Sequence, residues 1–128
     1  RGIGDVYKRQ VERNVPTVII GGKVKSSTDA SIGGIALNQI GQLNFDKAFL
    51  GMNGIDDEFY STPDLEEGSV QRAIIENAKK TYILADDSKI GVTSFVKVAP
   101  IKRAMIITNQ CEPQRLKVLK EKTEVIEV

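Results

Sequence analysis

Two short polar loops carry the side chains with the clearest capacity for chemistry. Asn53, Gly54 and Asp56 follow one short apolar run, and Lys89 lies in a loop containing aspartate and serine that follows another. A lysine in such a loop is a compact positive charge suited to a phosphate, and hydroxyl and backbone N–H groups add further donors. Asn and Asp can hydrogen-bond to sugar hydroxyls, and glycine lets the backbone curl around a ligand. The same residue types also form plain solvated turns, so spacing alone leaves both interpretations open.

A helical segment between the two loops adds two further candidates. Glu67 lies in its first turn, where a carboxylate could orient a hydroxyl or act as a base. Asp64 and Glu67 also have capping-box spacing, which explains Glu67 without any ligand. Gln71, one turn further on, could face the same side. Gly21 and Gly22 could let a ligand approach the backbone, although such a pair more often makes a turn.

The region 46–91 predicts the elements that would position these side chains. Its order is strand (48–50), loop, helix (from residue 65, capped by Asp64), strand (82–85) and loop, which is typical of a βαβ unit in a parallel sheet. We expect Lys79 and Lys80 in the last turn of the helix, where cations are favoured. Ligands bind beyond the carboxyl ends of strands in open sheets of this kind, so both loops fall where a site is expected.

The remaining pattern predicts one compact α/β domain with a mostly parallel sheet flanked by helices. Residues 1–10 have no clear period and are interpreted as an irregular or foreign leader before a domain of residues 11–128, with a short native strand or helix start as the alternative. Gly33-Gly34 is expected to allow close packing of a helix on the sheet. The other expected elements are a buried strand at 15–20, a loop or edge strand at 23–29, a helix capped by Ser31, strands at 94–98 and 104–108, a helix at 112–120 and a final strand at 123–128.

Composition excludes several classes of function. Lys and Arg number 18 against 17 Asp and Glu, a formal charge of +1, so no basic surface for nucleic acid is indicated. No apolar run approaches the roughly 20 residues of a membrane helix, and no signal peptide is visible. A single cysteine, Cys111, cannot form an internal disulfide, which fits the cytoplasm. The absence of histidine removes the commonest general base and most transition-metal sites, so neither a cofactor nor a metal is expected.

Four separated motifs then make the chain recognisable. FDKAFLGMNGID, STPDLEEGSVQRAII, ILADDSKIG and MIITN resemble, in this order, the C-terminal sensor domain of DeoR-family bacterial transcriptional regulators. The resemblance runs from about residue 15 to the C-terminus. It implies a fold related to ribose-5-phosphate isomerase, a phosphorylated sugar or related metabolite as effector, and a homo-oligomer. DNA would be bound only by a separate winged helix-turn-helix domain. The residues it carries over are Asn53, Gly54, Asp56, Glu67 and Lys89.

The sequence also departs from the family pattern. The family usually has lysine where this chain has Gln71, which would change effector preference or affinity. It often has aspartate where this chain has Asn109, which we interpret as a neutral exchange. The DNA-binding domain and the opening segment of the sensor domain are missing, so the chain resembles a repressor fragment. Exposed sheet edges or faces then predict marginal stability or self-association.

Three functions therefore remain in competition. The first is a sensor domain that binds a phosphorylated sugar without turnover and shifts the repressor between conformations. The second is a sugar-phosphate isomerase or deaminase, with Glu67 as base and Lys89 as electrostatic stabiliser. The third is a domain that serves oligomerisation alone. The resemblance favours the first, which is not an enzyme.

Overall fold

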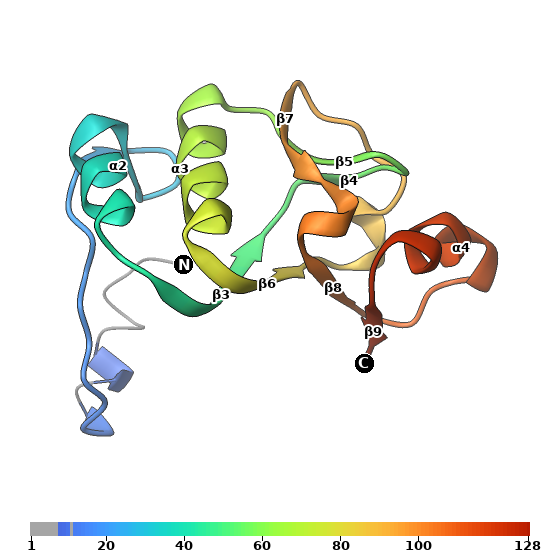
Figure 1. Cartoon of the computed structure of the whole chain (residues 1–128), viewed down its shortest axis with the longest axis horizontal. Coiled ribbons are helices and arrows are strands. Elements are labelled where there is room, and N and C mark those ends of the chain that lie inside the picture. Colours follow the sequence, from blue (N-terminus) through green and yellow to red (C-terminus); the bar gives the residue numbers. More distant parts are fainter. Residues whose placement is uncertain (1–7, 11) are drawn as a thin grey trace.

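The computed structural model describes residues 8–10 and 12–128 (Figure 1). Of the expected leader, residues 1–7 lie outside the described residues and residues 8–10 are helical. The helices are α2 (Gly33–Gly41), α3 (Leu65–Glu76) and α4 (Pro113–Lys122), with short 3-10 helices η1 (Asp87–Lys89) and η2 (Ile101–Arg103). The strands are β1 (Lys23–Lys25), β2 (Ala30–Ile32), β3 (Phe45–Gly51), β4 (Gly54–Ile55), β5 (Phe59–Thr62), β6 (Ala78–Leu84), β7 (Val96–Pro100), β8 (Met105–Thr108) and β9 (Val125–Glu127).

A parallel sheet of four strands in the order β3-β6-β8-β9 forms the base of the domain. Helix α3 connects β3 to β6, and α4 connects β8 to β9, so the predicted βαβ unit is confirmed. The register places Gly51 opposite Leu84 at the carboxyl ends of β3 and β6. The two chemically interesting loops therefore leave the sheet side by side.

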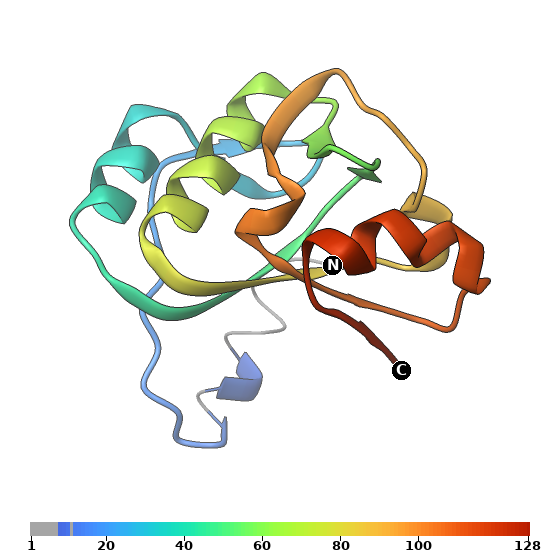
Figure 2. The same cartoon turned by 45° about the vertical axis from the view of Figure 1, so that its right-hand side comes forward.

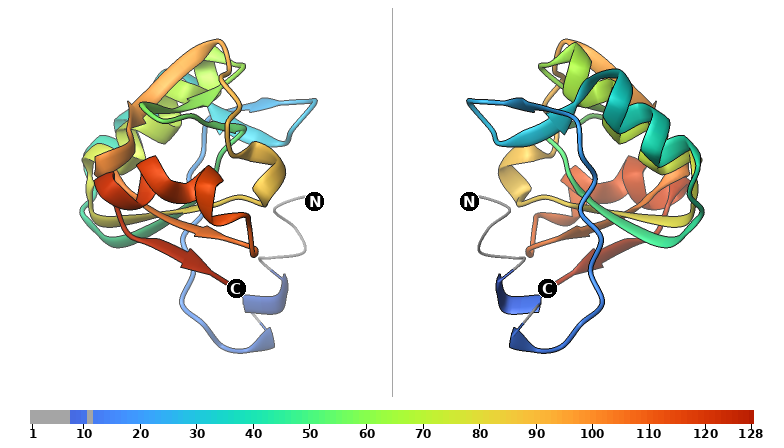
Figure 3. Two further views of the ribbon diagram at one scale, coloured as in Figure 1. Left: turned by 90° about the vertical axis from the view of Figure 1, so that its right-hand side faces the viewer. Right: turned by 90° about the vertical axis from the view of Figure 1, so that its left-hand side faces the viewer.

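One face of this sheet is buried, whereas the other, open face is only partly covered by the described residues. Ile83 and Ile106 lie in the core cluster together with Ile75 of α3 and Leu116 of α4, so both helices cover the same face. Figures 2 and 3 show α2, α3 and α4 on one side of the strands. On the opposite face the stacked rings of Phe49 and Tyr82 lie 5.1 Å apart, and Phe49 is 58% exposed. A second row of that face consists of Leu84, Ile107 and Ile126.

Two smaller sheets complete the domain on the covered side. The antiparallel sheet β4-β5-β7 packs on α3, where Arg72 donates from Nε to the Val98 carbonyl oxygen at 3.2 Å. Its centre is Tyr60, which is fully buried and whose hydroxyl lies 2.9 Å from the carbonyl oxygens of Ile101 and Ala104. Burial raises the pKa of Tyr60. Strands β1 and β2 form a separate antiparallel hairpin, which confirms the expected edge strand near residues 23–29.

Several local predictions are wrong. Residues 15–20 are extended without strand pairing, and Val18 is 85% exposed rather than buried. A strand requires a neighbouring strand for its N–H and C=O groups, and β-branched composition does not supply one. Ser31 is not the N-cap of α2, because it lies in β2 and its hydroxyl donates to the Ile20 carbonyl oxygen at 3.0 Å.

Two further predictions about helix interiors and ends are also wrong. Gly33 and Gly34 face open space, so close packing does not explain the pair, although the φ of +86° at Gly33 suits glycine. Helix α3 ends at Glu76, with Asn77 as its C-cap, and Lys79 and Lys80 belong to β6. The apolar spacing did not reveal this boundary, because the alternation of β6 begins directly after the helix.

Candidate functional site

The loops that follow β3 and β6 are joined to each other. Ile55 and Ile90 form an isolated parallel bridge, and the Gly91 N–H donates to the Ile55 carbonyl oxygen at 2.7 Å. Asn53 therefore lies on one loop and Lys89 on its neighbour, both just beyond the carboxyl edge of the sheet. Ligand sites of open parallel sheets lie at this edge, so the two loops lie where a site is expected.

Asn53 is the exposed member of the first loop. Its Oδ1 accepts a hydrogen bond from the Thr62 hydroxyl at 3.1 Å, which orients the amide from β5. The Nδ2 group makes no hydrogen bond with another described residue. An oriented amide with a donor turned toward solvent is suited to a ligand hydroxyl or phosphate oxygen.

Gly54 is buried and has a packing role. A Cβ atom there would lie 2.6 Å from the Val92 carbonyl oxygen and 2.7 Å from the Ser61 hydroxyl oxygen. No side chain fits at these distances, so the loop after residue 91 approaches this backbone closely because residue 54 is glycine. This requirement exists without any ligand.

Asp56 holds the turn between β4 and β5. Its Oδ1 accepts from the N–H groups of Phe59 at 2.7 Å and Glu58 at 2.8 Å, and its Oδ2 accepts from the Thr93 hydroxyl at 2.8 Å. Partial burial alone would raise the pKa of Asp56, but these hydrogen bonds and the charge of Lys97 outweigh it and lower the pKa. The carboxylate thus joins the two loops of the site, with both of its oxygens occupied.

Lys89 closes the short 3-10 helix η1 and is half-buried. Asp86 caps this turn, because its Oδ1 accepts from the Ser88 N–H at 2.9 Å and also from the Ser88 hydroxyl. The Ser88 hydroxyl, then its N–H, and also the charge of Lys89 lower the pKa of Asp86. Among the described residues Lys89 makes no ion pair within 4.0 Å, which leaves its ammonium group suited to an anionic ligand.

Two side chains outside the predicted set of site residues hold this turn. Asn109, directly after β8, accepts from the Asp87 N–H at 2.7 Å and donates to Asp87 Oδ1 at 3.0 Å. Arg115, in the first turn of α4, donates from Nη2 to the carbonyl oxygens of Asp87 at 2.8 Å and Ile90 at 3.0 Å. Asn109 is a departure from the family pattern in sequence, and no local pattern marks Arg115, whose partner Asp87 is 28 residues away.

Glu67 stands at the start of α3 with a partner from the β1–β2 hairpin. Its N–H donates to Asp64 Oδ2 at 3.0 Å, which confirms Asp64 as the N-cap. Its carboxylate pairs with the ammonium group of Lys25 at 3.3 Å, and Asp64 pairs with the same group at 3.0 Å. The pKa of Lys25 is raised, chiefly by its hydrogen bond to Asp64 and also by that to Glu67. These contacts outweigh desolvation, which would lower the pKa. Lys25 is 42 residues from Glu67, so no local pattern predicts the pair.

Gln71 faces the carboxyl end of β3. Its Nε2 donates to the Gly51 carbonyl oxygen at 3.1 Å, whereas its Oε1 is buried without a hydrogen-bond partner among the described residues. Gln71 is therefore adjacent to the start of the first loop. The Gly21 N–H instead donates to Gln39 Oε1 at 2.9 Å, and Gly22 lies against Ala36. Their described contacts are thus with α2 and not with the two loops.

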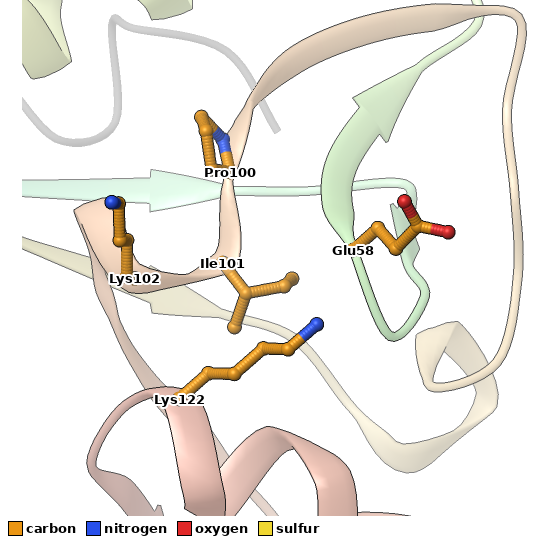
Figure 4. A pocket seen from close by; sticks show the side chains of 5 residues that line it. All are labelled: Glu58, Pro100, Ile101, Lys102 and Lys122. Carbon is orange, nitrogen blue, oxygen red and sulfur yellow. The ribbon is translucent and has the colours of Figure 1, made fainter.

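A separate cavity of about 290 Å³ opens elsewhere, lined by Glu58, Pro100, Ile101, Lys102 and Lys122 (Figure 4). It contains none of the predicted site residues. Lys122 donates to the Asp57 carbonyl oxygen, and Lys102 is exposed. Lys122 ends α4 and η2 precedes β8, so the cavity lies toward the amino ends of β8 and β9, away from the edge where the loops meet.

Residues 8–10 and 12–128 contain no group of three or more metal-ligating side chains that could hold an ion. No helix in this part of the chain is long and apolar enough to cross a membrane.

A family model described as "DeoR C terminal sensor domain" matches residues 6–110. The chain belongs to the DeoR sensor-domain family. The match includes both loops, α3 and the first strands of the parallel sheet, so the edge described above lies within the part that defines the family. The resemblance noted from the four sequence motifs is thereby confirmed.

Named relatives of this DeoR sensor domain are transcriptional regulators. The HTH-type transcriptional regulator FruR of Bacillus subtilis, itself described as uncharacterized, is 40% identical over 116 residues, which cover 90% of this chain and 46% of that protein. A lactose phosphotransferase system repressor of Staphylococcus epidermidis is 27% identical over 109 residues, which cover 84% of this chain and 43% of that protein. The transcriptional repressor GlcR of Bacillus subtilis is 29% identical over 104 residues (80% and 40%). The chain spans less than half the length of these relatives.

Proposed function

We propose that this DeoR sensor domain binds a phosphorylated sugar, or a closely related metabolite, as the effector of a repressor of sugar metabolism. The observation that carries the proposal is the bridge between Ile55 and Ile90, which unites the loops of Asn53 and Lys89 at one sheet edge. Lys89 anchors the phosphate as a point charge. The name of one relative, a lactose phosphotransferase system repressor, supports the sugar part of the proposal.

The other candidate residues have different roles in this proposal. Asn53 and Gln71 hydrogen-bond to ligand hydroxyls, because each has an amide beside the carboxyl end of β3. Glu67 also contacts the ligand, because its carboxylate can accept from a ligand hydroxyl while it pairs with Lys25. Asp56 and Gly54 shape the loops, whereas Gly21 and Gly22 contact α2 and make no ligand contact in this proposal.

Regulation follows from differential binding. The effector favours one arrangement of a cytoplasmic homo-oligomer and so changes the affinity of a separate DNA-binding domain for its operator. A ligand with equal affinity for both arrangements would regulate nothing, however tightly it bound.

A thermal-shift panel tests the binding claim. It contains fructose 1-phosphate, fructose 6-phosphate, tagatose 6-phosphate, glycerol 3-phosphate and 2-deoxyribose 5-phosphate, each beside its unphosphorylated parent. A selective rise in melting temperature with one phosphorylated compound is expected, since ligand at 100 times its Kd adds about 2.7 kcal/mol to the unfolding free energy. No response to any phosphorylated compound at saturating concentration would contradict the proposal for these effectors.

Catalysis is the competing candidate, because Glu67 offers a carboxylate and Lys89 a cation near the same edge. The Lys25 ion pair argues against a free base at Glu67. Incubation with ribose 5-phosphate or glucosamine 6-phosphate, followed by NMR detection of product, separates the two. Binding without turnover is expected. Turnover that disappears in Glu67→Gln would establish the enzyme instead.

A further inference from the structure

The loop that carries Lys89 is fixed chiefly at one residue, Asp87. Its backbone N–H and carboxylate contact Asn109, and its carbonyl oxygen contacts Arg115. The Asp87 Oδ2 atom also lies 3.6 Å from Arg115 Nη1. The donor set of Arg115 thus spans both the carboxylate and the backbone of the turn.

The ends of the loop are secured differently from its apex. Ile90 is buried in the core and bridges to Ile55, which fixes the far end. Ala85 continues the sheet, since its N–H donates to the Ile107 carbonyl oxygen at 3.1 Å. Among the described residues, the side chains that hold residues 87–89 are the Asp86 cap, Asn109 and Arg115, beside the backbone hydrogen bonds of the 3-10 turn itself.

We propose that Asn109 and Arg115 are positioning residues that hold the 86–90 loop, before any ligand binds, in the conformation that presents Lys89. The inference rests on the proposed function for Lys89. A loop ordered in advance spares the ligand the conformational entropy of ordering it, and so raises affinity without touching the ligand.

The chemistry of the two side chains suits this role. One guanidinium nitrogen of Arg115 donates to the carbonyl oxygens of Asp87 and Ile90. These residues are three positions apart, so the contact links the two ends of the turn. A lysine at the same place lacks the fork of donors, although it keeps the charge. The Asn109 amide both accepts from and donates to Asp87, and an aspartate could only accept. The exchange interpreted as neutral from sequence therefore has a predicted cost.

Amide hydrogen exchange of the ligand-free chain tests the positioning role directly. Arg115→Ala should speed exchange at the N–H groups of Ser88, Lys89 and Ile90 by about tenfold or more, a local opening below the global unfolding free energy. Lys117→Ala is the matched control, since Lys117 is an exposed cation two residues further along α4. Asn109→Asp should also speed exchange. Unchanged exchange in both Arg115→Ala and Asn109→Asp would overturn the inference.

Affinity separates positioning from a charge that acts on the ligand itself. With fructose 1-phosphate and inorganic phosphate as probes, Arg115→Ala should raise Kd about tenfold, and Arg115→Lys should restore little of that loss. Full recovery in Arg115→Lys would show that long-range charge suffices and would overturn the positioning role. If the wild-type chain binds neither probe, the proposed function fails for these ligands, while the exchange result still decides whether the two side chains fix the loop.

Discussion

At the scale of single residues, Gly54 shows how a site residue can be required for steric reasons. Gly54→Ala should lower the unfolding free energy by roughly 1–3 kcal/mol, because its Cβ would overlap the Val92 carbonyl oxygen at 2.6 Å. Gly51→Ala is the control, since a Cβ at Gly51 meets nothing within 4 Å. Urea denaturation of both variants measures the difference. Equal stabilities would show that the 91–94 segment moves aside at no cost.

Asp56 gives a prediction for acid sensitivity. Its pKa is lowered in the folded chain from the ordinary value of 3.8, so the unfolded chain binds the proton more readily. Stability from this group is therefore fully present above pH 3.8 and is lost as pH falls through the folded pKa. In urea denaturation, the stability difference between wild type and Asp56→Asn should be constant at neutral pH and shrink below pH 3.8. A difference that stays constant down to pH 2 would contradict the role of the ionised carboxylate.

At the scale of elements, the N-terminus of α3 combines a cap with an ion pair. Asp64→Ala removes both and should cost about 1 kcal/mol of unfolding free energy, the usual value of an N-cap. Asp64→Asn keeps the side-chain acceptor and loses the pair with Lys25, whose partly exposed, solvent-screened setting predicts a smaller loss. Urea denaturation of the two variants compares the contribution of the cap with that of the ion pair. A loss in Asp64→Asn as large as in Asp64→Ala would assign the stabilisation to charge.

Local sequence patterns predicted the elements whose determinants are local. Strands β3, β6, β8 and β9 and helices α3 and α4 follow from apolar periodicity and the Asp64 cap. Residues 15–20 have strand composition but no paired neighbour, and pairing is a property of the whole fold. The position of the two loops at the carboxyl edge of the sheet could be predicted from the order of the elements, whereas the ligand roles of their side chains stay predictions. The contacts of Lys25 and Arg115, 42 and 28 residues from their partners, required the fold.

At the scale of the whole molecule, the open face of the parallel sheet predicts association. Its apolar side chains are Phe49, Tyr82, Leu84, Met105, Ile107 and Ile126. An exposed apolar surface of this kind favours burial against another surface. The chain should therefore self-associate with rising concentration in sedimentation velocity, and Leu84→Lys, at a residue that is 44% exposed, should reduce the association. A monomer that melts reversibly and cooperatively at high concentration would contradict this prediction.

The central claim is that Lys89 holds the phosphate of a sugar ligand, and a thermodynamic cycle tests it most directly. Calorimetric titration would measure the Kd of wild type and of Lys89→Ala for fructose 1-phosphate or the best compound of the panel. The Kd for the unphosphorylated parent would be measured by its competition with the phosphorylated compound. A coupling of about 0.5–3 kcal/mol is predicted, because Lys89→Ala should weaken the phosphorylated ligand and leave the parent unaffected. If Lys89→Ala weakens the binding of both ligands equally, or of neither, the claim is contradicted, and Lys89 is only a residue of the turn.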